Sequence, residues 1–183
     1  RLDFQTSGIL IAAKSRDIWE KLFEMLRAGQ IHKLYHAIVE GHAPQNQIVD
    51  LPLGARGRRS NKVRVFERAP KKKDRAQPAK SEISLIRYSP KLDLSLVEVR
   101  VDIGRRHQVR AHCSFAGHPL VGDRLYGATR AATDLGLGSR RSSALEFFLH
   151  ALEIQLKHPK SQANLKTEAG YQDDFADAIS RLS

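Results

Sequence analysis

The spacing of the apolar residues constrains the fold of this chain more than any other feature. Several segments alternate apolar and polar side chains, which is typical of strands that bury one face. The clearest are residues 33–40, 82–86, 92–103 and 148–156. Helical spacing predicts helices within residues 15–29, 104–117 and 172–183. Short turns join several of the strands, so we expect an α+β fold with a mixed, mostly antiparallel sheet flanked by helices and loops.

Two details of the predicted strands bear on the position of the site. Residues 9–13 are continuously apolar and predict a buried strand directly after a Thr-Ser-Gly turn. In residues 92–103 the apolar positions are even-numbered up to Leu96 and odd-numbered from Val97 onward. This change of phase predicts a β-bulge near Leu96.

The charge of the chain is strongly positive. Its 31 Lys and Arg residues outnumber 20 Asp and Glu residues, for a formal net charge of +11. Residues 54–80 alone hold eleven basic and two acidic residues. Such a stretch on a folded domain suits a polyanion, most commonly nucleic acid, and a solvated loop without a partner is the alternative. The stretch has no amphipathic apolar face, so binding to a membrane surface is not expected.

The size and the cysteine content set further bounds. At 183 residues we expect a single domain spanning residues 1–183. Because nothing precedes Arg1 to pair with the first predicted strand, we expect the opening N-terminal segment of this domain to be missing. The apolar runs are too short to span a bilayer. One cysteine, Cys113, excludes an internal disulfide and favours a reducing compartment, so we expect a cytoplasmic location.

Four places concentrate groups that can do chemistry, and one of them is the single residue His150. Asp3 lies beside a turn that leads into an apolar segment, where a rigid scaffold can aim a carboxylate for covalent chemistry; a plain hydrogen-bonded turn is the alternative. Tyr35 lies inside a predicted strand. Residues 104–112 bring arginines and backbone N–H groups to one helix N-terminus, an arrangement that attracts phosphate. An arginine from this block placed beside Asp3 would keep that carboxylate ionised.

A metal site is the alternative interpretation of the histidines. His107, His112 and His118 are five and six residues apart, which fits no common helical pattern of metal ligands. A metal-dependent nuclease built on them is therefore a poor hypothesis, and we expect no metal. Cys113 lies among apolar residues of a predicted helix and is expected to be an inert core thiol.

Considered together, five motifs resemble the RluA-type RNA pseudouridine synthases. The motifs are RLDxxTSGIL at 1–10, KLYHAIVEG at 33–41, GRRHQVRAH at 104–112, GHPLVGD at 117–123 and LHA at 149–151. They occur in the order of the family, and the resemblance covers residues 1–159. It implies the pseudouridine synthase catalytic fold and an isomerase that converts specific uridines of ribosomal or transfer RNA to pseudouridine.

The resemblance also implies roles for individual residues. Asp3 matches the nucleophile of the family, and Tyr35 matches the tyrosine that packs on the target base and is implicated in proton removal. Arg110 matches the arginine that pairs with the aspartate. Arg1 matches an arginine that can fill the space left by a flipped base, and Leu149 lies where a hydrophobic residue lines the pocket.

Base flipping is implied because a uridine inside a helix is out of reach of these groups. Phosphate contacts must supply most of the affinity, since uracil carries little charge. The expected RNA contacts, besides Arg1, are Arg56, Arg58, Arg59, Lys62, Arg105, Arg106 and His107. No redox or hydrolytic step occurs, so we expect no cofactor, and we expect a monomer.

The chain departs from the family at Arg106, where Thr or Ser is usual. We expect this extra cation to contact RNA; the alternative is that it disturbs the neighbouring pairing of Arg110 with Asp3. A non-catalytic RNA-binding module of the same fold is the alternative function. The presence of Asp3, Tyr35 and Arg110 together argues against it, because binding alone would not require that set.

Overall fold

The computed structural model describes residues 2–55, 60–137 and 146–183. Its main sheet comprises β1 (Ser7–Gly8), β2 (His32–Glu40), β3 (Asn46–Asp50), β6 (Lys80–Ser89), β7 (Leu94–Val101), β8 (Leu149–Lys157) and β9 (Asn164–Glu168). A separate hairpin is formed by β4 (Leu53–Gly54) and β5 (Arg64–Val65). The helices are α1 (Arg16–Arg27), α2 (Gln108–Phe115) and α3 (Asp173–Ser180), with short 3-10 turns at Lys72–Asp74, Arg124–Tyr126 and Thr133–Leu135. The expected α+β class is confirmed.

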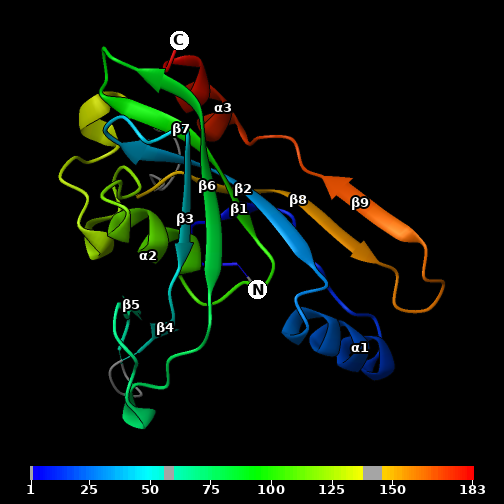
Figure 1. Ribbon diagram of the computed structural model, residues 1–183. Coiled ribbons are helices and arrows are strands. Elements are labelled where there is room, and N and C mark those ends of the chain that lie inside the picture. Colours follow the sequence, from blue (N-terminus) through cyan, green and yellow to red (C-terminus); the bar gives the residue numbers. More distant parts are fainter. Residues whose placement is uncertain (1, 56–59, 138–145) are drawn as a thin grey trace.

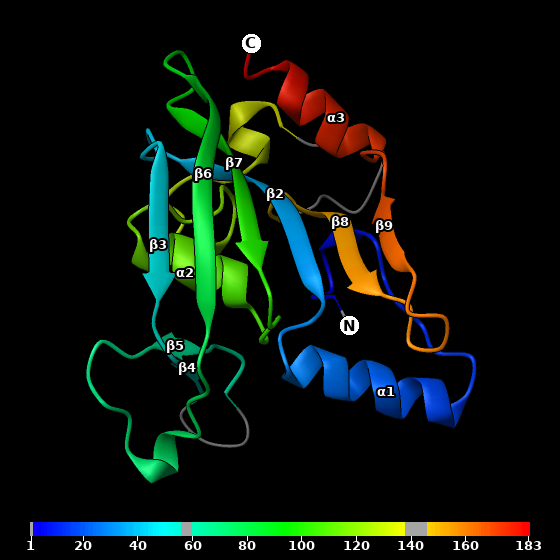
Figure 2. The same cartoon turned by 45° about the vertical axis from the view of Figure 1, so that its right-hand side comes forward.

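The sheet is mixed but mostly antiparallel, as expected. Its order is β1-β8-β2-β7-β6-β3, and β9 pairs with β8. Only the pairing of β1 with β8 is parallel among the described strands. The β4–β5 hairpin extends beyond the ends of β3 and β6, while α1 lies beneath the ends of β2 and β8 (Figures 1 and 2). No helix in the described ranges is long and apolar enough to cross a membrane.

The change of phase in β7 arises because different helices cover its two faces. Leu96 packs in a cluster with Phe175 of α3, whereas Val97 packs in a second cluster with Val109 of α2. β7 pairs with β2 without interruption from Leu94 to Val101. The bulge expected in β7 near Leu96 is therefore wrong. The register shift at this level lies in the neighbouring strand, between Leu85 and Arg87 of β6.

The buried strand expected at residues 9–13 is also wrong. β1 ends at Gly8, and after one further hydrogen bond, from the Ile9 N–H to the Ala151 carbonyl at 2.9 Å, the chain leaves the sheet. Leu10 is 59% exposed. The physical reason is that β9 occupies the same edge of β8 from Glu153 onward, so a longer β1 has no free edge to pair with.

Candidate active site

Asp3 is held by a turn that precedes the short parallel strand β1. The Thr6 N–H donates to the Asp3 carbonyl at 2.9 Å and closes this turn. Two residues further on, Gly8 adopts φ of 105°, and a Cβ atom there would lie 2.1 Å from the Ala151 carbonyl oxygen. Glycine is therefore required for β1 to lie against β8. This contact fixes the backbone that carries Asp3.

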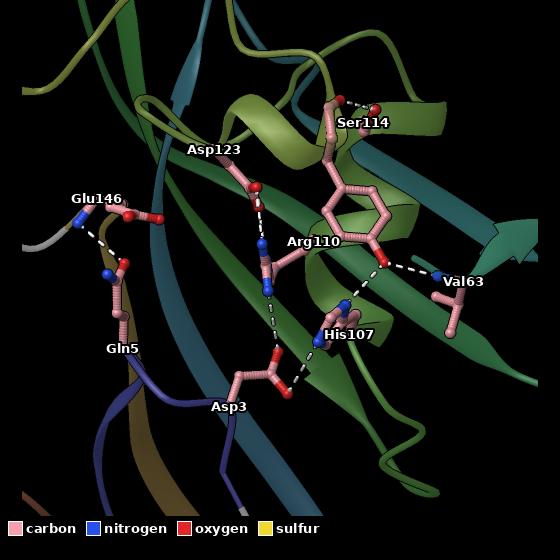
Figure 3. A network of polar contacts seen from close by, with 9 residues as sticks. Asp3, Gln5, Val63, His107, Arg110, Ser114, Asp123 and Glu146 are labelled. Carbon is pink, nitrogen blue, oxygen red and sulfur yellow. Dashed lines mark hydrogen bonds and ion pairs between the residues drawn. The ribbon is translucent and has the colours of Figure 1, made fainter. Parts of the chain in front are cut away.

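The Asp3 carboxylate points toward the N-terminal end of α2 (Figure 3). The Arg110 Nη1 atom lies 3.8 Å from its Oδ2 atom, and the His107 Nε2 atom lies 3.9 Å from its Oδ1 atom. Both distances suit ion pairs but exceed hydrogen-bond length. The Asp3 side chain is only 14% exposed. Each oxygen of the carboxylate thus faces one donor without being bound by it.

The hydrogen bonds of Arg110 go to a different carboxylate, that of Asp123. The Arg110 Nε atom donates to Asp123 Oδ2 at 2.6 Å, and Nη2 donates to Oδ1 at 2.8 Å. Both residues are buried. Burial opposes the charge of Arg110, but the hydrogen bond and the charge of Asp123 outweigh it and raise the pKa of the guanidinium. Arg110 is therefore a fixed cation that Asp123 positions beside Asp3.

Tyr35 of β2 and Leu149 of β8 lie beside this group. Tyr35 pairs with Ala151, to which Gly8 is also paired, so the three strands align at this level. Tyr35, Leu149 and Asp3 line one pocket together with Lys33, two residues before Tyr35 on the same strand. Burial, helped by the charge of Asp3, raises the pKa of Tyr35 to about 12. Tyr35 is consequently a neutral phenol at pH 7.

The expected RNA contacts fall into two groups. Arg105 and His107 line the same pocket as Asp3. Arg106 and Lys62 are exposed on the basic side of the molecule, and the Arg106 Nη2 atom donates to the Ser60 carbonyl at 2.6 Å. Arg106 is not among the residues that line the Asp3 pocket. Arg1, Arg56, Arg58 and Arg59 lie outside the described residues.

The described parts of the basic segment, residues 52–55 and 60–80, are attached to the beginning of α2 and to Tyr126 by hydrogen bonds. The Arg105 Nε atom donates to the Pro78 carbonyl at 3.1 Å, and the Gln108 Nε2 atom donates to the Lys80 carbonyl at 2.8 Å. The Val63 N–H donates to the Tyr126 hydroxyl at 3.1 Å. The segment is therefore anchored on either side of His107, at Arg105 and at Gln108 of α2, and at Tyr126.

The three histidines of the metal hypothesis do not converge. The buried His112 bonds to Ser81 and to the Leu51 carbonyl, and burial lowers its pKa to about 4. His118 contacts the Glu40 carbonyl at 2.9 Å. Within the described ranges no three His, Cys, Asp or Glu residues form a group suited to a metal ion. Cys113 is buried, and burial raises the pKa of its thiol to about 12, which suits the expected inert thiol.

Sequence reasoning gave no role to three residues that the structure places at the site: Lys33, Asp123 and Tyr126. The sequence could have placed Lys33 at the site, because a strand puts residues 33 and 35 on the same face. Asp123 lies within the GHPLVGD motif, but only the fold brings it to Arg110. Tyr126 was not detectable, since its contacts with His107 and Val63 join segments far apart in the sequence.

Residues 1–115 match the family model described as RNA pseudouridylate synthase. Among curated proteins, the chain is 34% identical over 161 residues to an uncharacterized RNA pseudouridine synthase of Chloroflexus aurantiacus, covering 88% of this chain and 45% of that protein. It is 30% identical to the ribosomal large subunit pseudouridine synthase D of Pseudomonas aeruginosa and 31% identical to the tRNA pseudouridine synthase C of Pectobacterium carotovorum. Both alignments cover the whole chain, and 55% and 49% of the relatives.

Two solved human structures share the fold. RNA pseudouridylate synthase domain containing 4 superposes with a TM-score of 0.73 at 25% identity, and domain containing 1 with a TM-score of 0.71 at 20% identity. Each comparison covers all of this chain and about three quarters of the other, 74% and 78% respectively. The chain therefore belongs to the RNA pseudouridylate synthase family, and its resemblance to the RluA-type enzymes is confirmed. It spans about half the length of the curated relatives it matches.

Proposed function

We propose that this chain isomerises uridine to pseudouridine in ribosomal or transfer RNA, with Asp3 as the nucleophile. The observation that carries the proposal is the state of the Asp3 carboxylate. It lines a pocket with Tyr35, faces the fixed cation Arg110, and stays beyond hydrogen-bond distance of both Arg110 and His107. A carboxylate that faces a fixed cation yet is not hydrogen-bonded by these donors is available to attack.

The reaction cleaves the bond between the ribose and nitrogen 1 of uracil, rotates the base, and rejoins it through carbon 5. Carbon 5 loses a proton and nitrogen 1 gains one, so the product has the same composition as the substrate. A covalent link to Asp3 would keep the separated fragment in the pocket. Tyr35, as a neutral phenol, would pack on the base. It would take part in the proton transfer only if RNA binding changes the pKa of its hydroxyl.

RNA would be held by the basic segment, with the target uridine flipped into the pocket beside Asp3. The exposure of these side chains supports this arrangement. Lys62 and Arg106 are exposed and can reach RNA phosphates, whereas Asp3 is largely buried. Phosphate contacts supply affinity without reading the base. Lys62 also lies 5.1 Å from the centre of the Tyr126 ring, close to the contacts that lead to Asp3.

We propose that residues 1–183 act as one catalytic unit and as a monomer in the cytoplasm. Support for the monomer comes from the origin of Asp3, Tyr35, Arg110 and Leu149, which all lie in one chain and meet without a contribution from a second copy.

The proposal is tested by incubating the purified protein with ribosomal and transfer RNA. Pseudouridine is then mapped as carbodiimide-dependent stops of reverse transcription. We expect new stops at a small number of uridines, and the same stops in the presence of EDTA. RNA binding without any stop would favour the non-catalytic module instead. RNA cleavage that EDTA abolishes would favour the nuclease.

Replacing Lys62 by Gln is expected to weaken binding of every RNA by a similar factor. Loss of one phosphate contact on a single strand should lower the slope of log K against log salt concentration by about 0.7. Binding is measured by fluorescence anisotropy at several salt concentrations. Lys21→Gln, on the exposed side of α1, is the matched control. An unchanged slope for Lys62→Gln would remove this residue from the RNA interface.

A further inference from the structure

Tyr126 joins the basic segment to His107, and His107 faces Asp3. The Tyr126 hydroxyl accepts a hydrogen bond from the Val63 N–H at 3.1 Å and lies 2.9 Å from the Nδ1 atom of His107. The other ring nitrogen of His107, Nε2, lies 3.9 Å from Asp3 Oδ1. Figure 3 shows the ends of this series, Val63 and Asp3, on either side of His107.

The hydrogen-bond chemistry of a phenol selects one tautomer of His107. The Tyr126 oxygen already accepts from Val63, and its own proton needs an acceptor. In the part of the chain that the structure describes, Nδ1 of His107 is the acceptor within reach. Donation to Nδ1 leaves the ring proton on Nε2, where it faces the Asp3 carboxylate. The opposite tautomer would direct a lone pair at a carboxylate oxygen and leave the phenol proton without a partner.

The backbone around His107 is specialised for this orientation. His107 has φ of 54° and ψ of 23°, a left-handed conformation that is uncommon for residues other than glycine, although histidine adopts it more often than most. Its ring meets that of Tyr126 edge to face, with centres 5.7 Å apart. Tyr126 itself is only 3% exposed and its backbone carbonyl accepts from Ser114 Oγ of α2. The two rings are therefore held from both sides.

We propose that Tyr126 and His107 are positioning residues that transmit the placement of the basic segment to Asp3, with His107 held as the Nε2–H tautomer. This inference rests on the proposed function, because it assigns a task to Asp3. When RNA binds the basic segment and Val63 keeps its bond to Tyr126, the Nε2–H group directs Asp3 Oδ1 and leaves Oδ2 to Arg110. If Val63 were displaced, His107 would no longer be held as the Nε2–H tautomer, and the Asp3 carboxylate would no longer be held in one orientation.

Protonation of His107 opposes this arrangement. Besides Tyr126, the charged groups that act on His107 are Asp3, Arg110, Arg106 and Asp123. Burial is the main cause that lowers its pKa, so the ring is neutral at pH 7. Donation from Tyr126 to Nδ1 further favours the neutral form. As the pH falls through the His107 pKa, the imidazolium would bind Asp3 as an ion pair and make it less available for attack.

The decisive experiment is the tautomer of His107 in the RNA-free protein, read from long-range nitrogen–proton correlations of histidine-labelled samples. His107→Gln identifies the signal by its loss. We expect the Nε2–H form in the wild type and a mixture of tautomers in Tyr126→Phe. A wild-type Nδ1–H form would overturn the proposal even if the protein is active. If the protein modifies no RNA while the tautomer is as expected, only the proposed function fails.

The kinetic counterpart uses the same variant. Tyr126→Phe should lower the single-turnover rate about five-fold, the effect of one ordinary hydrogen bond, when the rate is measured at saturating protein so that any change in Kd for RNA does not contribute. Because the neutral ring loses a donor, its pKa should rise, and the acid limb of the pH–rate profile should move to higher pH. His107→Gln should remove that limb. If the acid limb did not move in Tyr126→Phe, the proposed positioning of His107 by Tyr126 would be wrong. The control is Tyr88→Phe, which loses the hydrogen bond from Tyr88 to Asp93.

Discussion

Asp3→Asn is expected to abolish pseudouridine formation while leaving RNA affinity within a few-fold of the wild type. An amide has the shape of the carboxylate but is not a nucleophile, so the single-turnover rate should fall by about 10³ or more. The side chain is 14% exposed and makes no hydrogen bond to Arg110 or His107, so the substitution should leave the fold intact. The rate is measured by carbodiimide mapping over time, and affinity by anisotropy.

The matched control for Asp3→Asn is Asp134→Asn, which removes an exposed carboxylate that does not line the pocket. It should keep the wild-type rate. If Asp3→Asn isomerised uridine at the wild-type rate, Asp3 would not be the nucleophile and the proposed mechanism would be wrong.

Asp123→Ala is expected to have the largest effect on stability. It leaves the buried guanidinium of Arg110 without its two hydrogen bonds, and breaking a buried ion pair in this way costs about 3–5 kcal/mol. Arg110 would then turn to Asp3, the other carboxylate within 4 Å, and bind it. We therefore expect a lower free energy of unfolding, measured in urea, and a lower single-turnover rate.

Two further variants isolate the cause. Asp177→Ala breaks the pair with Arg181, whose side chains are both about half exposed, 49% and 48%, and should cost less than about 1 kcal/mol. The double variant Arg110→Met with Asp123→Leu removes both buried charges, so it should recover stability but not activity. If Asp123→Ala and Asp177→Ala lowered the free energy of unfolding equally, the buried pair would contribute no more to stability than the exposed pair.

Much of the fold follows from local patterns. The alternation in residues 33–40 predicted β2, and the apolar spacing of Phe175, Ile179 and Leu182 predicted α3. The two errors have one cause, competition between distant segments. Residues 9–13 have the composition of a strand, but β9 occupies the edge they would need. The change of phase at Leu96 reflects the packing of α3, which lies some eighty residues later in the chain.

The site shows the same limit. Asp3, Tyr35 and Leu149 could be selected from motifs, and the structure brings them to one pocket. The motifs indicated that Arg110 pairs with Asp3, whereas its hydrogen bonds go to Asp123. A motif specifies residue types and their order, but packing decides which of two carboxylates lies at 2.6 Å from the cation and which at 3.8 Å.

The contact of Gly8 with Ala151 has a consequence for how this segment can vary among related chains. Residues 4–6 lie between Asp3 and β1, and the Gln5 Oε1 atom accepts a hydrogen bond from the Glu146 N–H. Phe4 is fully exposed, so the identity of that side chain is free to change. The number of residues is not. One inserted residue would move Asp3 by up to about 3.8 Å, as far as it now lies from Arg110. Relatives should therefore differ here by substitution and never by length.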